Sequence, residues 1–320
     1  MSDLRDLRRL EPQFLRAPSA HNAQPWLLDY TTDRIELRFD SARELPAGDP
    51  TRRDLFLSLG ALVEAVLIAA TGAGASLEFE PAIDLERRRV GAFVAAAVPY
   101  ATPFTPDDLE RRQTSRLVYA PGRLSSDDLA DARAALGSEE ALHELPAREL
   151  VDLYVRADRH LYDSPHVVEE LRSWLRLSRR DPRYGQDGLT SECLALSRPA
   201  AAAVALLLRP GVYPLVRALR VHRTFTRATR GLLDRDGSVI VLSGPVETLK
   251  QVLGHGRSLF RVWLALARRG LYTHPLSQIL DCTETERELA AIVAAPSPAR
   301  PFSVFRAGRS EPPARSHRLR

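Results

Sequence analysis

Residues 17–26 read APSAHNAQPW and directly follow an N-terminal segment with a helical apolar repeat. Apolar residues in that segment recur at spacings of three and four, so we expect a helix over about residues 3–16 with one buried face. The face consists of Leu7, Leu10 and Phe14. Pro18 is expected to end the helix, because a proline disfavours helical geometry in the residue before it. The sequence therefore predicts a rigid turn after this helix.

The predicted turn carries three side chains that can hydrogen-bond to the edge of a ring. Ser19, Asn22 and Gln24 each provide donors or acceptors. A flat heterocycle with alternating donors and acceptors needs such a lining. The alternative from the residues alone is a capped helix end followed by a strand anchored at Trp26. Both interpretations stay open at this point.

Length, composition and charge limit the classes of protein to consider. The chain has 320 residues, of which 44% are hydrophobic, enough for one large domain or two ordinary ones. Its 45 basic residues are interspersed with 41 acidic ones, and Lys250 is the only lysine. We therefore expect no nucleic-acid partner, and we interpret the basic run 315–320 as a solvated tail.

Two further features bear on the compartment. Cys193 and Cys282 lie far apart, which fits two reduced thiols better than a disulfide framework or a zinc site. No secretory signal opens the sequence. The apolar run 199–208 is too short to span a bilayer and is expected to form a buried helix in a lid or interface. We expect a cytoplasmic protein with no membrane partner.

The elements expected along the chain fall into two sets separated by the proline-rich linker 99–106. Residues 181–188 are polar and turn-rich, which indicates a surface loop. The expected strands are 35–39, 76–79, 92–98, 238–243 and 302–306. The expected helices, besides 3–16 and one around 63–70, are 107–116, 125–136, 147–161, 165–179 and 247–269.

Comparison of the two halves reveals an internal repeat. Gly60 and Gly256 each begin a segment with apolar residues at identical offsets, and a second glycine closes each segment. The first segment continues with Val63, Val66, Leu67, Ala70 and Gly74, and the second with Leu259, Val262, Trp263, Leu266 and Gly270. The repeat suggests a duplicated unit that forms a pseudo-dimer within one chain.

A second motif, RRQTSR at residues 111–116, follows the linker. On the expected helix, Arg112 and Arg116 lie one turn apart and share a face, with the hydroxyls of Thr114 and Ser115 between them. Guanidinium groups and hydroxyls are suited to phosphate, because the planar fork of arginine pairs bidentately with phosphate oxygens. The alternative is a solvated basic helix end.

Together the two motifs resemble those of the FMN-dependent nitroreductase family. That family carries Arg-x-Ser/Thr-x-Arg/Lys for the phosphate and Pro-Ser-x-x-Asn-x-Gln-Pro-Trp for the flavin. This chain matches the first at Arg112, Thr114 and Arg116, and the second at Pro18, Ser19, Asn22, Gln24, Pro25 and Trp26. The motifs stand in the reverse of the usual order and far apart, which resembles the single-chain, Acg-like branch. The segments 45–50 and 273–278 also fit, whereas about 140–235 matches weakly.

The resemblance implies a fold and a set of cofactor residues. The fold is an α+β sandwich with a mostly antiparallel sheet flanked by helices, duplicated as halves 1–105 and 106–320, with a lid around 180–235. FMN is the implied cofactor. The implied cofactor-binding residues are Pro18, Ser19, His21, Asn22, Gln24, Arg112, Gln113, Thr114, Arg116 and Arg315, with Arg318 as an alternative to Arg315.

The resemblance also implies a function but names no catalytic residue. It implies an oxidoreductase that moves hydride through flavin N5 between a donor such as NAD(P)H and a small electron-poor or metabolite substrate. A flavin-storage protein with little turnover and a biosynthetic FMN-dependent dehydrogenase remain alternatives. His21 could donate to flavin or substrate, or simply shape the turn. His160, His166 and Glu169 lack a third ligand at convincing spacing, so no metal is expected. Self-association is left open.

Overall fold

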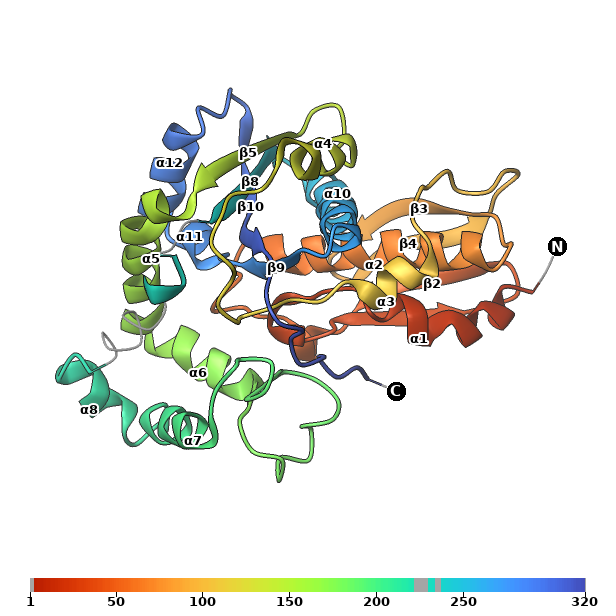
Figure 1. Ribbon diagram of the computed structural model, residues 1–320. Helices are drawn as coiled ribbons and strands as arrows, with labels where there is room; N and C mark the ends of the chain where they lie inside the picture. The colour runs from red at the N-terminus through yellow and green to blue at the C-terminus, as the bar shows by residue number, and fades with distance from the viewer. Residues whose placement is uncertain (1–2, 222–229, 234–236, 320) are drawn as a thin grey trace.

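Two four-stranded antiparallel sheets, each carrying one long helix, form the body of the protein in a computed structural model (Figure 1). The structure describes residues 3–221, 230–233 and 237–319. Two long helices, α2 (Arg53–Gly72) and α10 (Leu249–Arg268), lie against each other between the sheets, and the largest hydrophobic core surrounds this contact, which we call the seam. The expected α+β class with antiparallel sheets flanked by helices is confirmed.

The first sheet has the strand order β1-β2-β4-β3. Its strands are β1 (Trp26–Tyr30), β2 (Arg34–Phe39), β3 (Leu77–Asp84) and β4 (Arg89–Ala95). The connection from β2 to β3 is α2 (Arg53–Gly72), a helix of 20 residues. β2 alternates buried and less buried residues, as expected for a strand with one face on the core.

The second sheet repeats this arrangement with the order β5-β8-β10-β9. Its strands are β5 (Ala141–Pro146), β8 (Ser238–Pro245), β9 (Tyr272–Pro275) and β10 (Ala299–Gly308). Here β8 and β9 are joined through α10 (Leu249–Arg268), also of 20 residues. If the four strands of each sheet are numbered along the chain, they lie across the sheet in the order first, second, fourth, third. The long helix connects the second strand to the third.

Shorter helices cover the sheets and extend from the second half. Their bounds are η1 (Leu4–Leu10), α1 (Glu11–Phe14), η2 (Ala20–Asn22), η3 (Ser41–Arg43), α3 (Pro106–Arg111), α4 (Ser126–Ala134), η4 (Ala147–Leu150), α5 (Val151–Asp163), α6 (Pro165–Trp174), α7 (Arg198–Leu207), α8 (Tyr213–Ala218), α11 (Gln278–Asp281) and α12 (Thr283–Ile292). A small parallel pair, β6 (Leu175–Arg176) and β7 (Leu189–Thr190), brackets the polar loop after α6.

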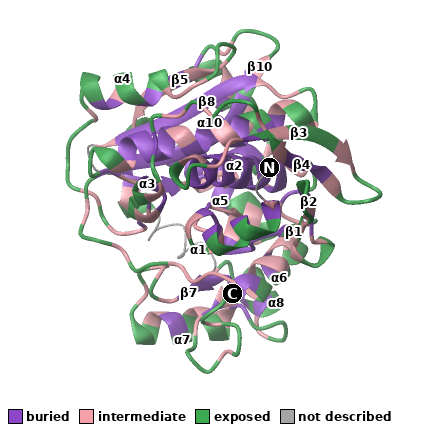
Figure 2. Cartoon of the chain, turned by 90° about the vertical axis from the view of Figure 1, so that its right-hand side faces the viewer, coloured by how far each residue is buried: buried purple, intermediate pink, exposed green. Residues whose placement is uncertain are grey.

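The packing of α2 against α10 depends on two glycines. A Cβ atom on Gly60 would lie 2.1 Å from the carbonyl oxygen of Leu253, and one on Gly256 would lie 2.3 Å from that of Leu57. The two contacts are reciprocal, since each glycine meets the residue three positions before the other. The backbones therefore approach as closely as only glycine permits. Buried residues accordingly concentrate along α2, α10 and β8 (Figure 2).

A buried carboxylate ties the same two helices together. Glu64 of α2 is fully buried and accepts hydrogen bonds from Arg257 at 2.9 Å, Arg261 at 3.2 Å and the hydroxyl of Tyr100 at 2.6 Å. Both arginines belong to α10. A buried charge is costly unless it is paired, so these bonds allow Glu64 to remain in the seam.

Three expectations from the sequence are wrong in their local detail. The helix expected over 107–116 ends at Arg111, because Thr114 pairs with Thr273 and Ser115 N donates to the Thr273 carbonyl at 3.0 Å. The helix expected over 165–179 ends at Trp174, where the chain enters β6. The run 199–208 is helical as expected, but only Ala201 within α7 is buried.

One helix in the described part of the chain, α2, is long and apolar enough to cross a membrane by length and composition alone. Its most apolar stretch is 89% buried inside the protein. Its place between the sheets explains its composition, because a helix that is apolar all round suits a fully buried position.

The glycine contacts generate a test of the seam. Gly60→Ala or Gly256→Ala is expected to lower the free energy of unfolding by about 1–3 kcal/mol, because the added methyl group meets backbone that cannot move aside. Gly254→Ala in the same helix is the matched control, since a Cβ there meets nothing within 4 Å. This control is expected to raise stability by up to about 1 kcal/mol through helix propensity. Urea denaturation of the three variants measures both effects, and equal losses in all three would contradict the role of close packing.

Candidate functional site

The turn predicted after the first helix is held in an unusual backbone conformation. His21, Asn22 and Gln24 all have positive φ angles, of 49°, 55° and 54°. Non-glycine residues rarely adopt this region, and such strain costs on the order of 1–3 kcal/mol per residue. The hydroxyl of Ser19 accepts a hydrogen bond from Gln24 N at 2.9 Å and so closes the turn. Strain of this kind is concentrated at functional sites.

Asn22 and Gln24 bind two distant segments to the turn. The amide nitrogen of Asn22 donates to the carbonyl oxygens of Gly188 at 3.2 Å and His317 at 3.1 Å. That of Gln24 donates to Gln186 O at 2.9 Å, and its side-chain oxygen accepts from Leu319 N at 2.8 Å. The loop 186–188 and the tail 317–319 therefore both lie on the turn.

The loop is anchored by a buried carboxylate. Asp187 is fully buried and pairs with Arg43 at 3.1 Å, with Arg176 at 2.9 Å and with Arg183. Arg43 comes from the first half, whereas the other two flank the loop. The surrounding arginines keep the pKa of Asp187 below its ordinary value despite burial, so the anchor remains charged. The loop is thus fixed against the first half at the turn.

Three arginines from separate parts of the chain gather beside the turn. Arg112 and Arg318 both donate to the carbonyl oxygen of Arg16, at 3.0 and 3.1 Å. Arg318 also donates to Asn22 Oδ1 at 2.8 Å, which connects the cluster directly to the turn. The guanidinium group of Arg112 lies 5.8 Å from the ring centres of both Phe260 and Trp263 on α10. We call Arg16, Arg112 and Arg318 the arginine cluster.

The arginine cluster has no direct carboxylate partner in the described residues, although the charge of Glu110 partly offsets that of Arg16 and Arg318. Burial, with the neighbouring charge of Arg16, lowers the pKa of Arg112 to about 9. Burial and the charges of the other two members also lower the pKa of Arg318 well below its ordinary value. The Nε atoms of Arg16 and Arg112 are buried without a hydrogen-bond partner. Such a cluster is costly alone and fits an anion with several acceptor oxygens.

The remaining residues of the second motif lie on extended chain. In extended backbone alternate residues point to the same side, so Arg112, Thr114 and Arg116 still share a side, although not through a helical turn. Arg112 approaches the Thr114 hydroxyl at 3.5 Å, and Arg116 donates to the Cys193 carbonyl at 3.3 Å. The side-chain oxygen of Gln113 is buried without a partner.

Other expected residues are placed as follows. Arg315 pairs with the exposed Glu110 at 2.8 Å, so Arg318 rather than Arg315 enters the arginine cluster. Pro18 is half-buried and Trp26 is buried in the core of the first half. Sequence reasoning missed Arg16, although its position directly before the residue 17–26 motif could have drawn attention to it. His255 lies inside α10 and pairs with Glu140, away from the turn.

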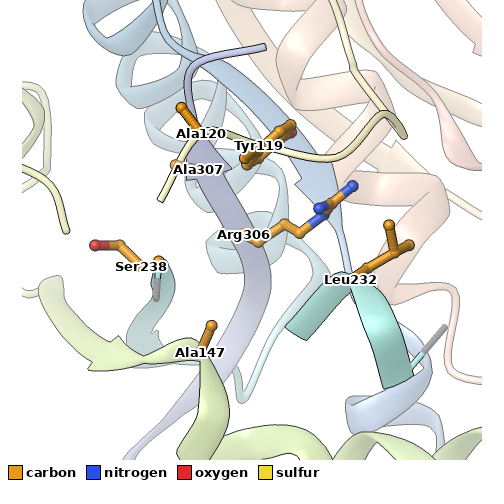
Figure 3. Close-up of a pocket in the computed structure, with 8 residues that line it drawn as sticks. Tyr119, Ala120, Ala147, Leu232, Ser238, Arg306 and Ala307 are labelled. Carbon is orange, nitrogen blue, oxygen red and sulfur yellow. The ribbon is translucent and has the colours of Figure 1, made fainter. Parts of the chain in front are cut away.

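A second group of basic side chains, His274 and Arg306, lies on the segment 273–278 and β10. Arg306 donates to His274 Nδ1 at 3.0 Å and lies 4.1 Å from the ring centre of Tyr119. Burial, with the charges of Arg116 and Arg306, lowers the pKa of His274 well below its ordinary value, so the ring is neutral. Arg306 and Tyr119 line a cavity of about 20 Å³ (Figure 3). This volume holds about one water molecule and is far too small for a cofactor.

Comparisons with known proteins find partial matches. No family model matches the chain. Two curated proteins of Mycobacterium tuberculosis, strains CDC 1551 and H37Rv, both named "Putative NAD(P)H nitroreductase", are 28% identical to it over 145 residues. The match covers 42% of this chain and 41% of each relative, so it spans about two fifths of their length. These names agree with the family that the two motifs resemble.

Solved structures with a similar arrangement share little sequence with the chain. A BluB-like flavoprotein from Clostridium difficile 630 is 13% identical with a TM-score of 0.40, over 67% of this chain and 93% of that one. A nitroreductase with bound FMN from Bacteroides fragilis is 12% identical with a TM-score of 0.38, over 67% and 92%. The FMN-dependent nitroreductase NfnB of Mycobacterium smegmatis, in complex with NADPH, is 13% identical with a TM-score of 0.37, over 64% and 88%.

The environment of His21 predicts a pH dependence of stability. Burial, with Arg116 nearby, lowers its pKa from 6.5 to about 4, and Asp54 offsets only part of this shift. The folded chain therefore keeps the ring neutral while the unfolded chain protonates it, so stability is lost as the pH falls from about 6.5 to 4. His21→Gln should flatten this part of the profile of unfolding free energy against pH. The exposed His166→Gln is the control, and an unchanged slope in His21→Gln would refute the assignment.

Proposed function

We propose that this chain is an FMN-binding oxidoreductase that takes electrons from NAD(P)H and reduces a small electron-poor substrate. The observation that carries the proposal is the arginine cluster, which lies beside the strained turn and has no direct carboxylate partner in the described residues. Its Arg112 is buried, and Arg16 and Arg318 are partly buried. Its unpartnered Nε atoms fit the terminal phosphate of FMN, since arginine pairs with phosphate through two parallel hydrogen bonds. The names of the curated relatives support the same reading.

In this proposal each part of the site has a separate task. Arg16, Arg112 and Arg318 hold the phosphate, with the Thr114 hydroxyl and Arg116 on the same side of the extended segment. Bound FMN supplies reversible hydride transfer at its N5 atom, while the protein supplies binding and electrostatics. Hydrogen-bond donors placed at the flavin ring would stabilise the negative charge that the ring gains on reduction.

The turn forms the flavin side of the proposed site. We assign Pro18, Ser19, His21, Asn22 and Gln24 to it, as the motif suggests. Because Asn22 and Gln24 are bonded to the loop 186–188 and the tail 317–319, they also fix these segments at the edge of the site. His21 is neutral near pH 7, so it serves there as a hydrogen-bonding group rather than a cation.

We also propose that the chain is a pseudo-dimer with halves 1–105 and 106–320. Three observations support it: both sheets have the same strand order, α2 and α10 have the same length, and Gly60 and Gly256 make reciprocal contacts. In both halves the long helix also lies in the same connection, between the second and third strands of its sheet.

Among the described residues of the second half we find no equivalent phosphate site, and we propose one FMN per chain. Residues 137–140 lead into β5 as the turn leads into β1, and they line an open cavity of about 360 Å³ with α10. There Glu140 is buried against His255 at 2.5 Å, and Arg257 and Arg261 are both paired with Glu64. A carboxylate in place of free guanidinium groups disfavours an anionic cofactor.

The names of the curated relatives support a reductase, and they do not support a flavin storage role or a biosynthetic dehydrogenase.

The phosphate assignment is tested by comparing FMN with riboflavin, which lacks the phosphate. The wild type should bind FMN more tightly, and Arg112→Gln or Arg318→Gln should weaken FMN binding by about 10- to 100-fold, the worth of one charge-assisted hydrogen bond. Riboflavin affinity should change little in either variant. Fluorescence quenching titrations measure both affinities and the stoichiometry.

Arg315→Gln is the matched control, because it removes an arginine of the same tail whose partner is the exposed Glu110. It should leave FMN affinity within about twofold, as expected for an exposed pair. Equal losses for Arg315→Gln and Arg318→Gln would place the phosphate elsewhere. Equal affinity of the wild type for FMN and riboflavin would remove the basis of the proposal.

The direction of electron flow is tested by anaerobic stopped-flow absorbance. FMN-loaded protein mixed with NADPH or NADH should lose its oxidised flavin band, and a nitroaromatic or quinone should restore it. A flavin that stays oxidised with both nucleotides would exclude the reductase and favour storage or a substrate-driven dehydrogenase. This measurement needs no variant, so a folding defect cannot explain its failure.

A further inference from the structure

The helices α7 and α8 form a peripheral arm that is apolar, basic and exposed. In Figure 1 they lie at the lower edge of the second half, away from both sheets. A small hydrophobic cluster of its own, with Val168, Leu208, Tyr213 and Val216 at its centre, joins the arm to the rest of the protein. We call residues 198–220 the basic arm.

The outward faces of the arm carry apolar residues that the fold does not use. On α7, Ala202, Ala205 and Leu206 recur at spacings of three and four and are all exposed. On α8, Leu215 and Leu219 lie four residues apart and are 60% and 66% exposed. Tyr213 and Val216, also on α8, are buried. The two helices and the residue after α8 therefore expose apolar side chains on their outward side in addition to those that pack inward.

The charge of the arm differs from that of the whole chain. Seven arginines and no acidic residue occur between Cys193 and Leu233, whereas acidic and basic residues nearly balance over the full sequence. Four of these arginines, Arg198, Arg209, Arg217 and Arg220, belong to the basic arm. Within the described part of the chain, no carboxylate pairs with Arg198, Arg209 or Arg220. The arm thus presents exposed leucines beside uncompensated positive charge.

We propose that the basic arm is a membrane-surface anchor that docks the protein on anionic phospholipid bilayers. Amphipathic helices with arginines and exposed leucines lie in the plane of the interface, with leucines inserted and cations on the lipid headgroups. Such helices need not span the bilayer, so the short length of the run 199–208 does not argue against this role. Leucines distinguish the lipid surface from a nucleic acid, whose phosphates would use the arginines but leave the leucines in water. Tyr213, the one aromatic residue of the arm, is buried and unable to stack on bases.

Sedimentation with vesicles tests the anchor on the full chain. The wild type should bind vesicles of phosphatidylcholine with phosphatidylglycerol, bind pure phosphatidylcholine far more weakly, and dissociate at high salt. Arg198→Gln, Arg209→Gln and Arg220→Gln together should weaken binding by about 100-fold, or about fivefold per arginine. Leu215→Ala with Leu219→Ala should weaken it by about tenfold through lost apolar burial.

Matched controls lie in the first half, far from the arm in Figure 1. The exposed pair Leu85→Ala with Val98→Ala matches the leucine variant, and Arg34→Gln, Arg38→Gln and Arg87→Gln match the change in charge. Both controls should keep wild-type binding, and circular dichroism verifies that every variant is folded.

Four outcomes would overturn the proposal. The first is equal wild-type binding to anionic and neutral vesicles, or none to either. The second is binding that the first-half arginine control weakens as much as the arm variant, which would show only a net-charge effect. The third is a leucine variant that binds vesicles normally while the arm arginines are needed for binding a single-stranded oligonucleotide. A change from dimer to monomer in the leucine variant, without vesicle binding by the wild type, would likewise assign the arm to self-association.

Discussion

The close approach of α2 and α10 is the constraint on which the rest of the structure depends. Gly60 and Gly256 let each helix backbone touch the other, and no larger residue fits at either position. Each helix is the central connection of one sheet, so their contact sets how the two sheets face each other. Glu64 is buried in the same seam and forms its ion pairs with two arginines of the opposite helix, while the hydroxyl of Tyr100 donates a further hydrogen bond to it. Close backbone packing at the two glycines and the ion pairs of Glu64 therefore hold α2 and α10 together at the same place.

The candidate site lies beside the contact of α2 and α10, and the position of Arg112 depends on α10. Arg112 comes from the segment that links the halves, packs on aromatic rings of α10 and donates to the carbonyl of Arg16. Arg318 returns from the other end of the chain to the same carbonyl. Three neighbouring cations, of which Arg112 is buried and the other two are partly buried, repel one another. The fold tolerates them because backbone carbonyls and Asn22 accept their hydrogen bonds.

Much of the fold could be predicted from residues that follow a simple period. The long apolar helices and the strands 238–243 and 302–306 were recognised because burial alone decides them. The helix expected over 107–116 failed because Thr114 and Ser115 pair with Thr273, more than 150 residues away in the chain. β5 and β9 were missed for the same reason, since short strands are stabilised mainly by neighbours distant in sequence.

The sequence by itself determined the chemistry of the site: a polar turn at residues 17–26, an arginine motif at 111–116 and a repeat around two glycines. These are local patterns, which the order of residues fully specifies. Only the tertiary structure decided that Arg16 and Arg318 join Arg112, that Arg315 remains on the surface, and that the apolar run of α7 faces outward. Those outcomes depend on which segments distant in the chain come into contact. Such contacts decide whether a buried charge finds a partner and whether a leucine is covered.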